Sequence, residues 1–133
     1  MLNVSYPAVF HHENSSYWVE FPDLPGCFTQ GSTLEEAYSF AKDALGTYLD
    51  TSEDIYTQDF KQPSSFEDIA KEYPSETVML VDFDSIVYAK HTKSRPVKKT
   101  LSIPEWLNNE ANKHGINFSQ VLQDALKEKL NLQ

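Results

Sequence analysis

The fold is decided by one stretch of sequence, Tyr17-Trp18-Val19-Glu20-Phe21-Pro22-Asp23-Leu24-Pro25-Gly26-Cys27-Phe28-Thr29-Gln30-Gly31-Ser32-Thr33-Leu34-Glu35-Glu36-Ala37. Apolar and polar side chains alternate over residues 17–21, which predicts a β-strand. Two prolines and a glycine within residues 22–26 predict a tight turn, and a short strand should follow over 27–30. Thr33 is a favourable helix N-cap, and Glu36 completes a capping box, so a helix should begin here.

The segments on either side extend this pattern into a small α+β layer structure. Alternation before the quoted stretch predicts a β-hairpin over residues 3–21. Apolar residues at helical spacing predict an amphipathic helix from 34 to 48. Residues 51–65 are polar and proline-marked, which favours a surface connection, and a short helix should follow to about Tyr73. The apolar residues 78–81 are suited to a buried strand, giving the order β-β-β-α-(α)-β.

Charge is spread unevenly over the 133 residues. Residues 1–94 carry 5 Lys and Arg against 16 Asp and Glu, whereas residues 95–133 carry 6 against 4. Phosphate affinity comes from Lys and Arg, so any nucleic-acid contact is expected in the second part only. The acidic part either meets a basic partner through complementary charge or simply keeps the protein in solution.

Composition narrows the class of protein further. No apolar run approaches the roughly 20 residues that cross a bilayer, and residues 1–5 lack the basic and apolar regions of a signal peptide. Cys27 is the single cysteine, which excludes an intrachain disulfide and favours a buried thiol. We therefore expect a soluble, cytoplasmic protein with no membrane contact, no cofactor and no metal.

The quoted stretch, with the block from Phe21 to Cys27 at its centre, closely resembles the signature of the HicB family of antitoxins. Residues 63–69 and 78–82 resemble the second half-domain of that family. The resemblance implies a partial ribonuclease-H-like fold without catalysis for residues 1–88. It also implies a partner, a HicA-type toxin that cleaves mRNA and that this domain binds and silences.

An acidic domain with exposed aromatic side chains is suited to cover the basic surface of an RNA-cleaving toxin. The expected toxin-binding residues lie in and around the proline-glycine turn: Glu20, Phe21, Asp23, Leu24 and Phe28. For Asp23 a second interpretation stays open, in which its carboxylate stabilises the turn through its own backbone.

The last part of the chain, residues 97–133, predicts a strand followed by two helices. Val97, Leu101 and Ile103 alternate with Lys98, Thr100 and Ser102, which indicates a strand with one apolar face. One helix should run over 104–114 and end at Gly115. A second should begin after Asn117, with Gln120 at its third position. This segment has too little core to fold alone, so a partner chain is expected.

The strand-helix-helix pattern resembles the ribbon-helix-helix family, whose paired strands lie in the DNA major groove. The resemblance implies an intertwined homodimer through residues 97–133 that binds double-stranded operator DNA. It implies that Lys98, Thr100 and Ser102 read bases, and that Asn117 and Ser119 belong to a phosphate clamp. Many HicB-like proteins end in a helix-turn-helix instead, but the alternating strand before Pro104 argues against that variant.

Further phosphate contacts are expected from Lys99 and Arg95. Residues 89–96 are polar and end in a proline, which predicts a linker between the two domains. The two resemblances together imply an antitoxin that neutralises its toxin and represses its own operon. Higher assembly of the dimers stays open.

Two alternatives belong to other functional classes. A ligand-sensing ribbon-helix-helix repressor would share every C-terminal feature. An active ribonuclease-H-like nuclease would need clustered carboxylates around two metal ions, and Asp82 and Asp84 on the last strand, with Asp23, are the candidates. The first strand, residues 4–10, supplies no carboxylate, and the adjacent His11 and His12 should point to opposite faces of a strand. We therefore expect a binding protein and no enzyme.

Overall fold

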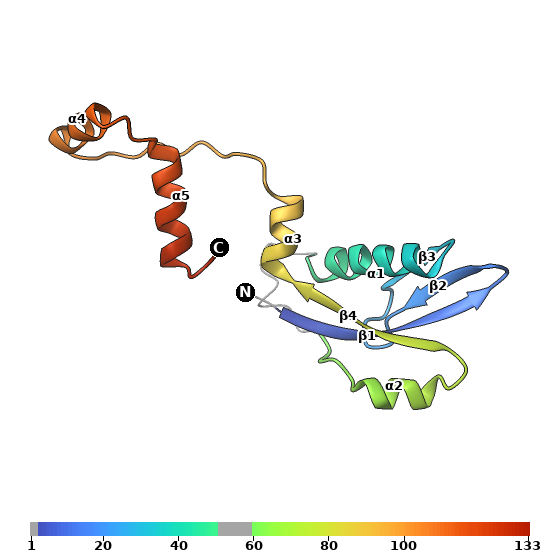
Figure 1. Cartoon of the computed structure of the whole chain (residues 1–133). Helices are drawn as coiled ribbons and strands as arrows, with labels where there is room; N and C mark the ends of the chain where they lie inside the picture. The colour runs from blue at the N-terminus through green and yellow to red at the C-terminus, as the bar shows by residue number, and fades with distance from the viewer. Residues whose placement is uncertain (1–2, 51–59) are drawn as a thin grey trace. The chain divides into compact units, whose positions relative to one another are not determined.

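The structure is a computed structural model of the chain that describes residues 3–50 and 60–133 (Figure 1). The chain divides into two compact units, residues 1–95 and residues 96–133. The first is called the acidic unit below, and the second is called the C-terminal unit. The division falls next to Pro96, the last residue of the predicted linker.

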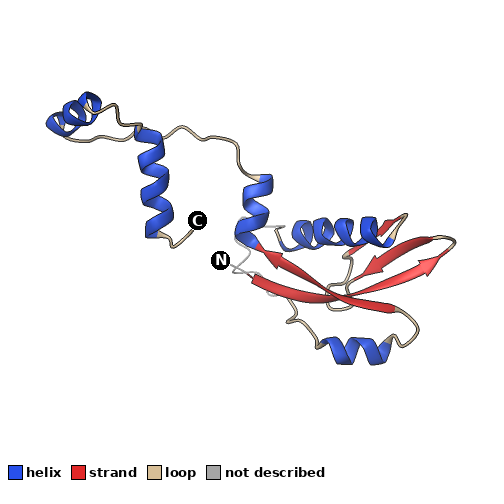
Figure 2. Cartoon of the chain, viewed as in Figure 1, coloured by secondary structure: helices blue, strands red, loops and turns tan. Residues whose placement is uncertain are grey.

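The acidic unit contains a four-stranded antiparallel sheet with the strand order β3-β2-β1-β4 (Figure 2). Its strands are β1 (Asn3–Glu13), β2 (Ser16–Glu20), β3 (Phe28–Gly31) and β4 (Thr77–Asp84). The predicted hairpin is formed by β1 and β2. Its two turn residues, Asn14 and Ser15, both have positive φ angles of 51° and 65°, which suits the twist of a two-residue hairpin turn.

Two helices cover the two faces of this sheet (Figure 1). Helix α1 (Leu34–Leu49) lies on one face and the shorter α2 (Phe66–Glu72) lies on the other. The main core lies between the sheet and α1. It is built from buried side chains of both, among them Tyr6, Ala8, Phe10, Val19, Ala37, Ala41, Leu45, Leu49, Val81 and Phe83. The order and the α+β class match the prediction from the sequence.

The starts of both helices follow the predicted capping. Thr33 Oγ1 accepts a hydrogen bond from the Glu36 backbone N–H at 3.1 Å, and Glu36 Oε1 accepts one from the N–H of Ser32 at 3.3 Å. Ser65 caps α2 through the N–H of Asp68. A Cβ atom on Gly31 would lie 2.6 Å from the backbone nitrogen of Ala37. Glycine is therefore what allows β3 to end directly against α1.

The segment after β4 differs from the prediction. Residues 89–96 were expected to be a linker, but the first four of them belong to helix α3 (Ser85–Thr92). Asp84 begins this helix by accepting hydrogen bonds from the N–H groups of Ile86 and Val87. Tyr88 packs against the core, but none of the helix's residues is fully buried. Of the predicted connection 51–65, residues 51–59 lie outside the described residues.

The C-terminal unit contains helices α4 (Glu105–Lys113) and α5 (Phe118–Lys129). Helix α4 ends as predicted at Gly115, whose φ is +66°, with the N–H of Ile116 bonded to the carbonyl of Ala111 at 3.1 Å. Asn117 Oδ1 caps α5 through the N–H of Gln120 at 3.1 Å. Residues 97–103, predicted to be a strand, are not in a strand, because a single chain offers them no pairing partner. Among the described residues, no helix has the length and apolar character needed to span a membrane.

Candidate functional site

The proline-glycine turn after β2 is closed by its own backbone. The N–H of Leu24 donates to the carbonyl of Phe21 at 2.9 Å, and the N–H of Cys27 donates to the carbonyl of Leu24 at 3.0 Å. Gly26 supplies the positive φ of 87° that the turn requires. Phe21, Leu24 and Cys27 are all buried. The turn is thus a part of the core. Burial also raises the pKa of the Cys27 thiol to about 11, so the thiol stays protonated at neutral pH.

Asp23 fastens this turn to a distant segment of the chain. Its side chain is only 1% exposed. One carboxylate oxygen accepts the backbone N–H of Ser64 at 2.7 Å, and the other accepts the Ser64 hydroxyl at 2.6 Å. The ammonium of Lys61 lies 3.0 Å from the latter oxygen. Burial acts to raise the pKa of Asp23, but the hydrogen bonds from Ser64 and Lys61 and the charge of Lys61 outweigh burial, so the pKa lies below its ordinary value.

Replacing Asp23 with asparagine is expected to destabilise the acidic unit. Asp23→Asn removes the negative charge that faces three donor groups, two of Ser64 and one of Lys61, and hydrogen bonds to charged groups are worth about 1.5–3 kcal/mol. We expect a loss of that size in the free energy of unfolding at neutral pH, measured with urea. Lys61→Met should cost less, about 0–1 kcal/mol, because the lysine side chain is largely exposed.

The same variant makes a prediction about pH. A carboxyl group whose pKa is depressed in the folded state stabilises the protein fully only above its unfolded pKa, about 3.9 for Asp. This contribution is lost as the pH falls through the lower, folded-state pKa. The gap in stability between wild type and Asp23→Asn should therefore close below about pH 4. If the difference in unfolding free energy between wild type and Asp23→Asn stays the same as the pH falls below about 4, this account of Asp23 is wrong.

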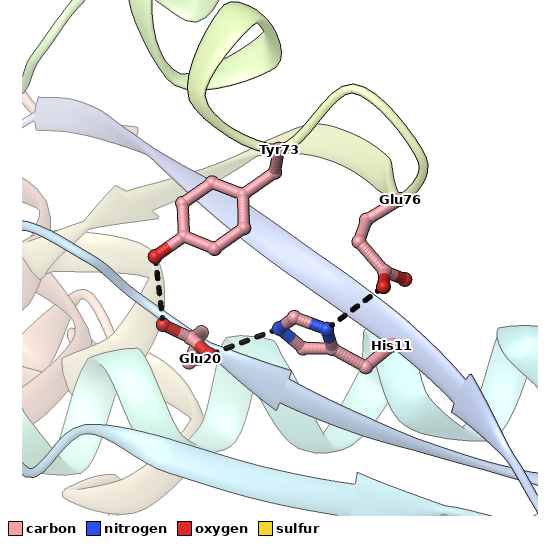
Figure 3. Close-up of polar contacts among 4 residues, drawn as sticks. All are labelled: His11, Glu20, Tyr73 and Glu76. Atoms are coloured by element: carbon pink, nitrogen blue, oxygen red, sulfur yellow. Dashed lines mark hydrogen bonds and ion pairs between the residues drawn. The ribbon is translucent and has the colours of Figure 1, made fainter.

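A second polar cluster lies on the sheet face that carries α2 (Figure 3). His11 Nε2 lies 2.9 Å from Glu20 Oε2, and His11 Nδ1 lies 3.3 Å from Glu76 Oε1. The hydroxyl of Tyr73 donates to Glu20 Oε1 at 3.3 Å. The His11 ring also stacks on Trp18, with 3.9 Å between the ring centroids. These contacts tie β1 and β2 to the segment that follows α2.

The cluster was not predicted from the sequence, because its members come from three separated segments. It engages both oxygens of Glu20 within the chain. Burial raises the pKa of the Tyr73 phenol, and the neighbouring Glu20 carboxylate raises it further, so the phenol remains the donor. The adjacent His12 stacks on Tyr17 instead, with 4.5 Å between the ring centroids.

The five expected toxin-binding residues therefore separate into two groups. Phe21, Asp23 and Leu24 are buried within the chain, which corrects the expectation that their side chains face a partner. Phe28 is 69% exposed, and Glu20 is partly exposed while it holds His11 and Tyr73. Of the five, only Phe28 and Glu20 therefore have side chains that a partner could reach.

The carboxylates considered for a two-metal site have other partners. Asp84 caps α3, Asp82 lies 3.4 Å from the ammonium of Lys42, and Asp23 is held by Ser64 and Lys61. Over residues 3–50 and 60–133, no three His, Cys, Asp or Glu side chains gather in a way that could hold a metal ion.

The expected DNA-binding residues are all exposed, and all except Arg95, the last residue of the acidic unit, lie in the C-terminal unit. Lys98, Lys99, Thr100 and Ser102 are exposed within the extended segment 97–103. Ser119 is exposed in the first turn of α5, where Asn117 acts as the cap. The unit also exposes many large apolar side chains, namely Val97, Leu101, Ile103, Trp106, Leu107, Ile116, Phe118, Val121, Leu126 and Leu130. Neither α4 nor α5 contains a buried residue.

These features define a small α+β protein with an acidic, aromatic-rich unit and a helical unit without buried residues in its helices. The chain belongs to the HicB-like antitoxin family of bacterial toxin–antitoxin systems, which matches it over residues 6–125. Membership of this family implies a regulatory role without enzymatic activity.

The chain also resembles individual known proteins, one of them a HicB antitoxin. It is 46% identical over 48 residues to antitoxin HicB 2 of Photorhabdus laumondii, and the matched region spans 36% of this chain and 34% of that protein. It is 32% identical over 106 residues to a 14.9 kDa protein of Haemophilus phage HP1, covering 77% of this chain and 74% of that protein.

Two solved structures share the fold. A toxin–antitoxin complex from Streptococcus pneumoniae contains a chain that is 29% identical, with a TM-score of 0.53, and the match covers 96% of this chain and 99% of that one. The antitoxin HicB of Burkholderia pseudomallei is 24% identical, with a TM-score of 0.55 and coverage of 96% and 97%. The latter likeness concerns the fold alone.

Proposed function

We propose that this chain neutralises a HicA-type, mRNA-cleaving toxin through its acidic unit and represses its own operon through its C-terminal unit. The observation that carries the proposal is the separation of charge between two compact units. Residues 1–95 have 10 more acidic than basic side chains, whereas residues 96–133 have one more basic than acidic side chain. Each unit is thus suited to a partner that the other would repel.

The acidic unit fits a basic protein. An enzyme that cleaves RNA presents Lys and Arg to the phosphates of its substrate, and complementary charge steers such a surface toward an acidic one. Exposed aromatic side chains, among them Trp18, Phe28 and Phe40, supply the apolar anchors that protein interfaces favour. The resemblance to the chain from a toxin–antitoxin complex supports a toxin as the partner.

The C-terminal unit fits a homodimer on DNA. Its exposed apolar side chains need a cover, and a second copy would supply one as it pairs residues 97–103 into a two-stranded ribbon. Lys98, Thr100 and Ser102 would then share one face and read base edges in the major groove. The free N–H groups at the start of α5, around Ser119, would bind a phosphate.

The test is purification of the chain from its native host. We expect a small basic protein to co-purify at stoichiometric ratio, and its mRNA cleavage to stop when the chain is added. Operator DNA from upstream of the two reading frames should be retarded by the same complex. Operator binding without any co-purifying protein would contradict the antitoxin role and favour the ligand-sensing repressor.

A further inference from the structure

A groove runs along the outer edge of β3 in the acidic unit. Two adjoining hollows form it, one along residues 26–29 and the other along residues 29–32. Both are lined by Thr29 of the strand and by Phe40 of α1. The far wall is one side of α1, where Glu36, Phe40 and Asp43 follow each other at intervals of about one turn. The groove therefore follows the outer edge of β3, with α1 as its second wall.

The backbone of β3 faces this groove with an open edge. The strand is the last in the order β3-β2-β1-β4, and over residues 3–50 and 60–133 it pairs with β2 alone. An edge strand presents a row of backbone N–H and C=O groups to which another strand can be added. Addition of a partner strand to such an edge is a common mode of peptide recognition.

Exposed aromatic side chains flank this edge on both faces of the sheet. Phe28 is opposite Glu20, which lies on the face that carries α2. Thr29 is opposite Val19, and Val19 belongs to the core under α1. Thr29 therefore lies on the α1 face, where Phe40 of α1 is found. Phe28 is 69% exposed and Phe40 is 43% exposed. Because the side chains of a strand alternate between the two faces, an added strand would meet one aromatic ring on each.

The charge of the groove selects a basic occupant. Its lining residues include the carboxylates of Glu36 and Asp43 and contain no Lys or Arg. The unit as a whole is strongly acidic, so a second copy of the same unit would bring like charges together at this edge. An extended segment with Lys or Arg side chains is favoured instead.

We propose that the outer edge of β3 receives an extended segment of the toxin, which adds to the sheet as a fifth strand. Apolar side chains of that segment pack against Phe28 and Phe40, and its basic side chains pair with Asp43 and Glu36. This inference rests on the proposed function, because it takes the basic partner to be the toxin. It places the contact surface next to the proline-glycine turn, which itself holds β3 in position.

The test measures toxin affinity for variants of the full-length chain, with the small basic protein that co-purifies with it as the probe. We expect Phe40→Ser and Asp43→Lys each to raise the Kd at least tenfold, which corresponds to about 1.4 kcal/mol. The matched control is Leu80→Ser, because Leu80 is 49% exposed on β4, the strand at the opposite edge of the sheet. Its Kd should stay within about twofold of wild type.

Three results would overturn the inference, and they differ from one another. If wild type binds the toxin and both groove variants bind it equally well, the surface is elsewhere and the proposed function stands. If Leu80→Ser weakens binding and Phe40→Ser does not, the partner uses the β4 edge. If the groove variants lower the molar mass of the free protein and leave toxin affinity unchanged, a second copy fills the groove. Failure of wild type to bind any toxin would instead refute the proposed function itself. Circular dichroism of each variant shows that the fold is kept.

Discussion

A fragment of residues 1–95 is expected to bind the toxin as tightly as the full chain does and to lose operator binding altogether. The acidic unit has its own sheet and its own buried core, so it should fold without the remaining residues. The fragment keeps Arg95, an expected phosphate contact, but lacks the expected base-reading and phosphate-clamp residues, which lie between Lys98 and Ser119. Toxin affinity by calorimetry and operator retardation in a gel measure the two halves of this result.

The molar mass of the same fragment provides the control. The exposed apolar side chains of the C-terminal unit need a second chain to cover them, so removal of that unit should lower the oligomeric state in solution. Light scattering on the fragment and on the full chain compares the two. An unchanged oligomeric state would place the dimer interface in the acidic unit, and a folded fragment that does not bind toxin would refute the division of roles.

The parts of the fold that could be predicted are those with local causes. The capping side chains Thr33, Ser65 and Asn117 each bond an N–H three residues ahead, so they lie within one sequence window. The β1–β2 hairpin is likewise specified by alternation and a two-residue turn. These signals are sufficient to give the order of elements and the α+β class.

The parts that could not be predicted depend on contacts between distant segments. Asp23 binds Ser64, 41 residues away, and nothing near Asp23 in the sequence indicates a buried carboxylate. The burial of Phe21 and Leu24 follows from the closure of the same turn. Helix α3 contains no buried residue, and it is positioned by Asp84, which caps its start, and by Tyr88, which packs against the core. The groove beside β3 appears only once the strand and α1 lie next to each other.

The segment 97–103 illustrates a different limit. Its alternation predicts a strand, yet the single chain leaves it without strand pairing, because a ribbon needs two copies. Sequence periodicity describes what a segment does in its final assembly, whereas one chain contains only half of the required hydrogen-bonding groups. The prediction of a ribbon therefore has to be tested by DNA binding.

Thr100→Ala is expected to weaken operator binding by roughly 1–3 kcal/mol per site and to relax the preference for one base pair. In a paired ribbon, the hydroxyl of Thr100 would face a base edge, and two copies in one dimer would double the loss. Ser119→Ala should weaken binding to operator and random DNA equally, because a contact to phosphate carries no sequence information.

Titration of an operator duplex and a random duplex with both variants, at two salt concentrations, separates the two roles. Affinity should fall with salt for wild type, because each Lys or Arg contact to a phosphate releases a counterion from the DNA. Toxin neutralisation should survive both substitutions, because neither residue belongs to the acidic unit. Equal losses on operator and random DNA for Thr100→Ala would move the reading surface from the extended segment to a helix.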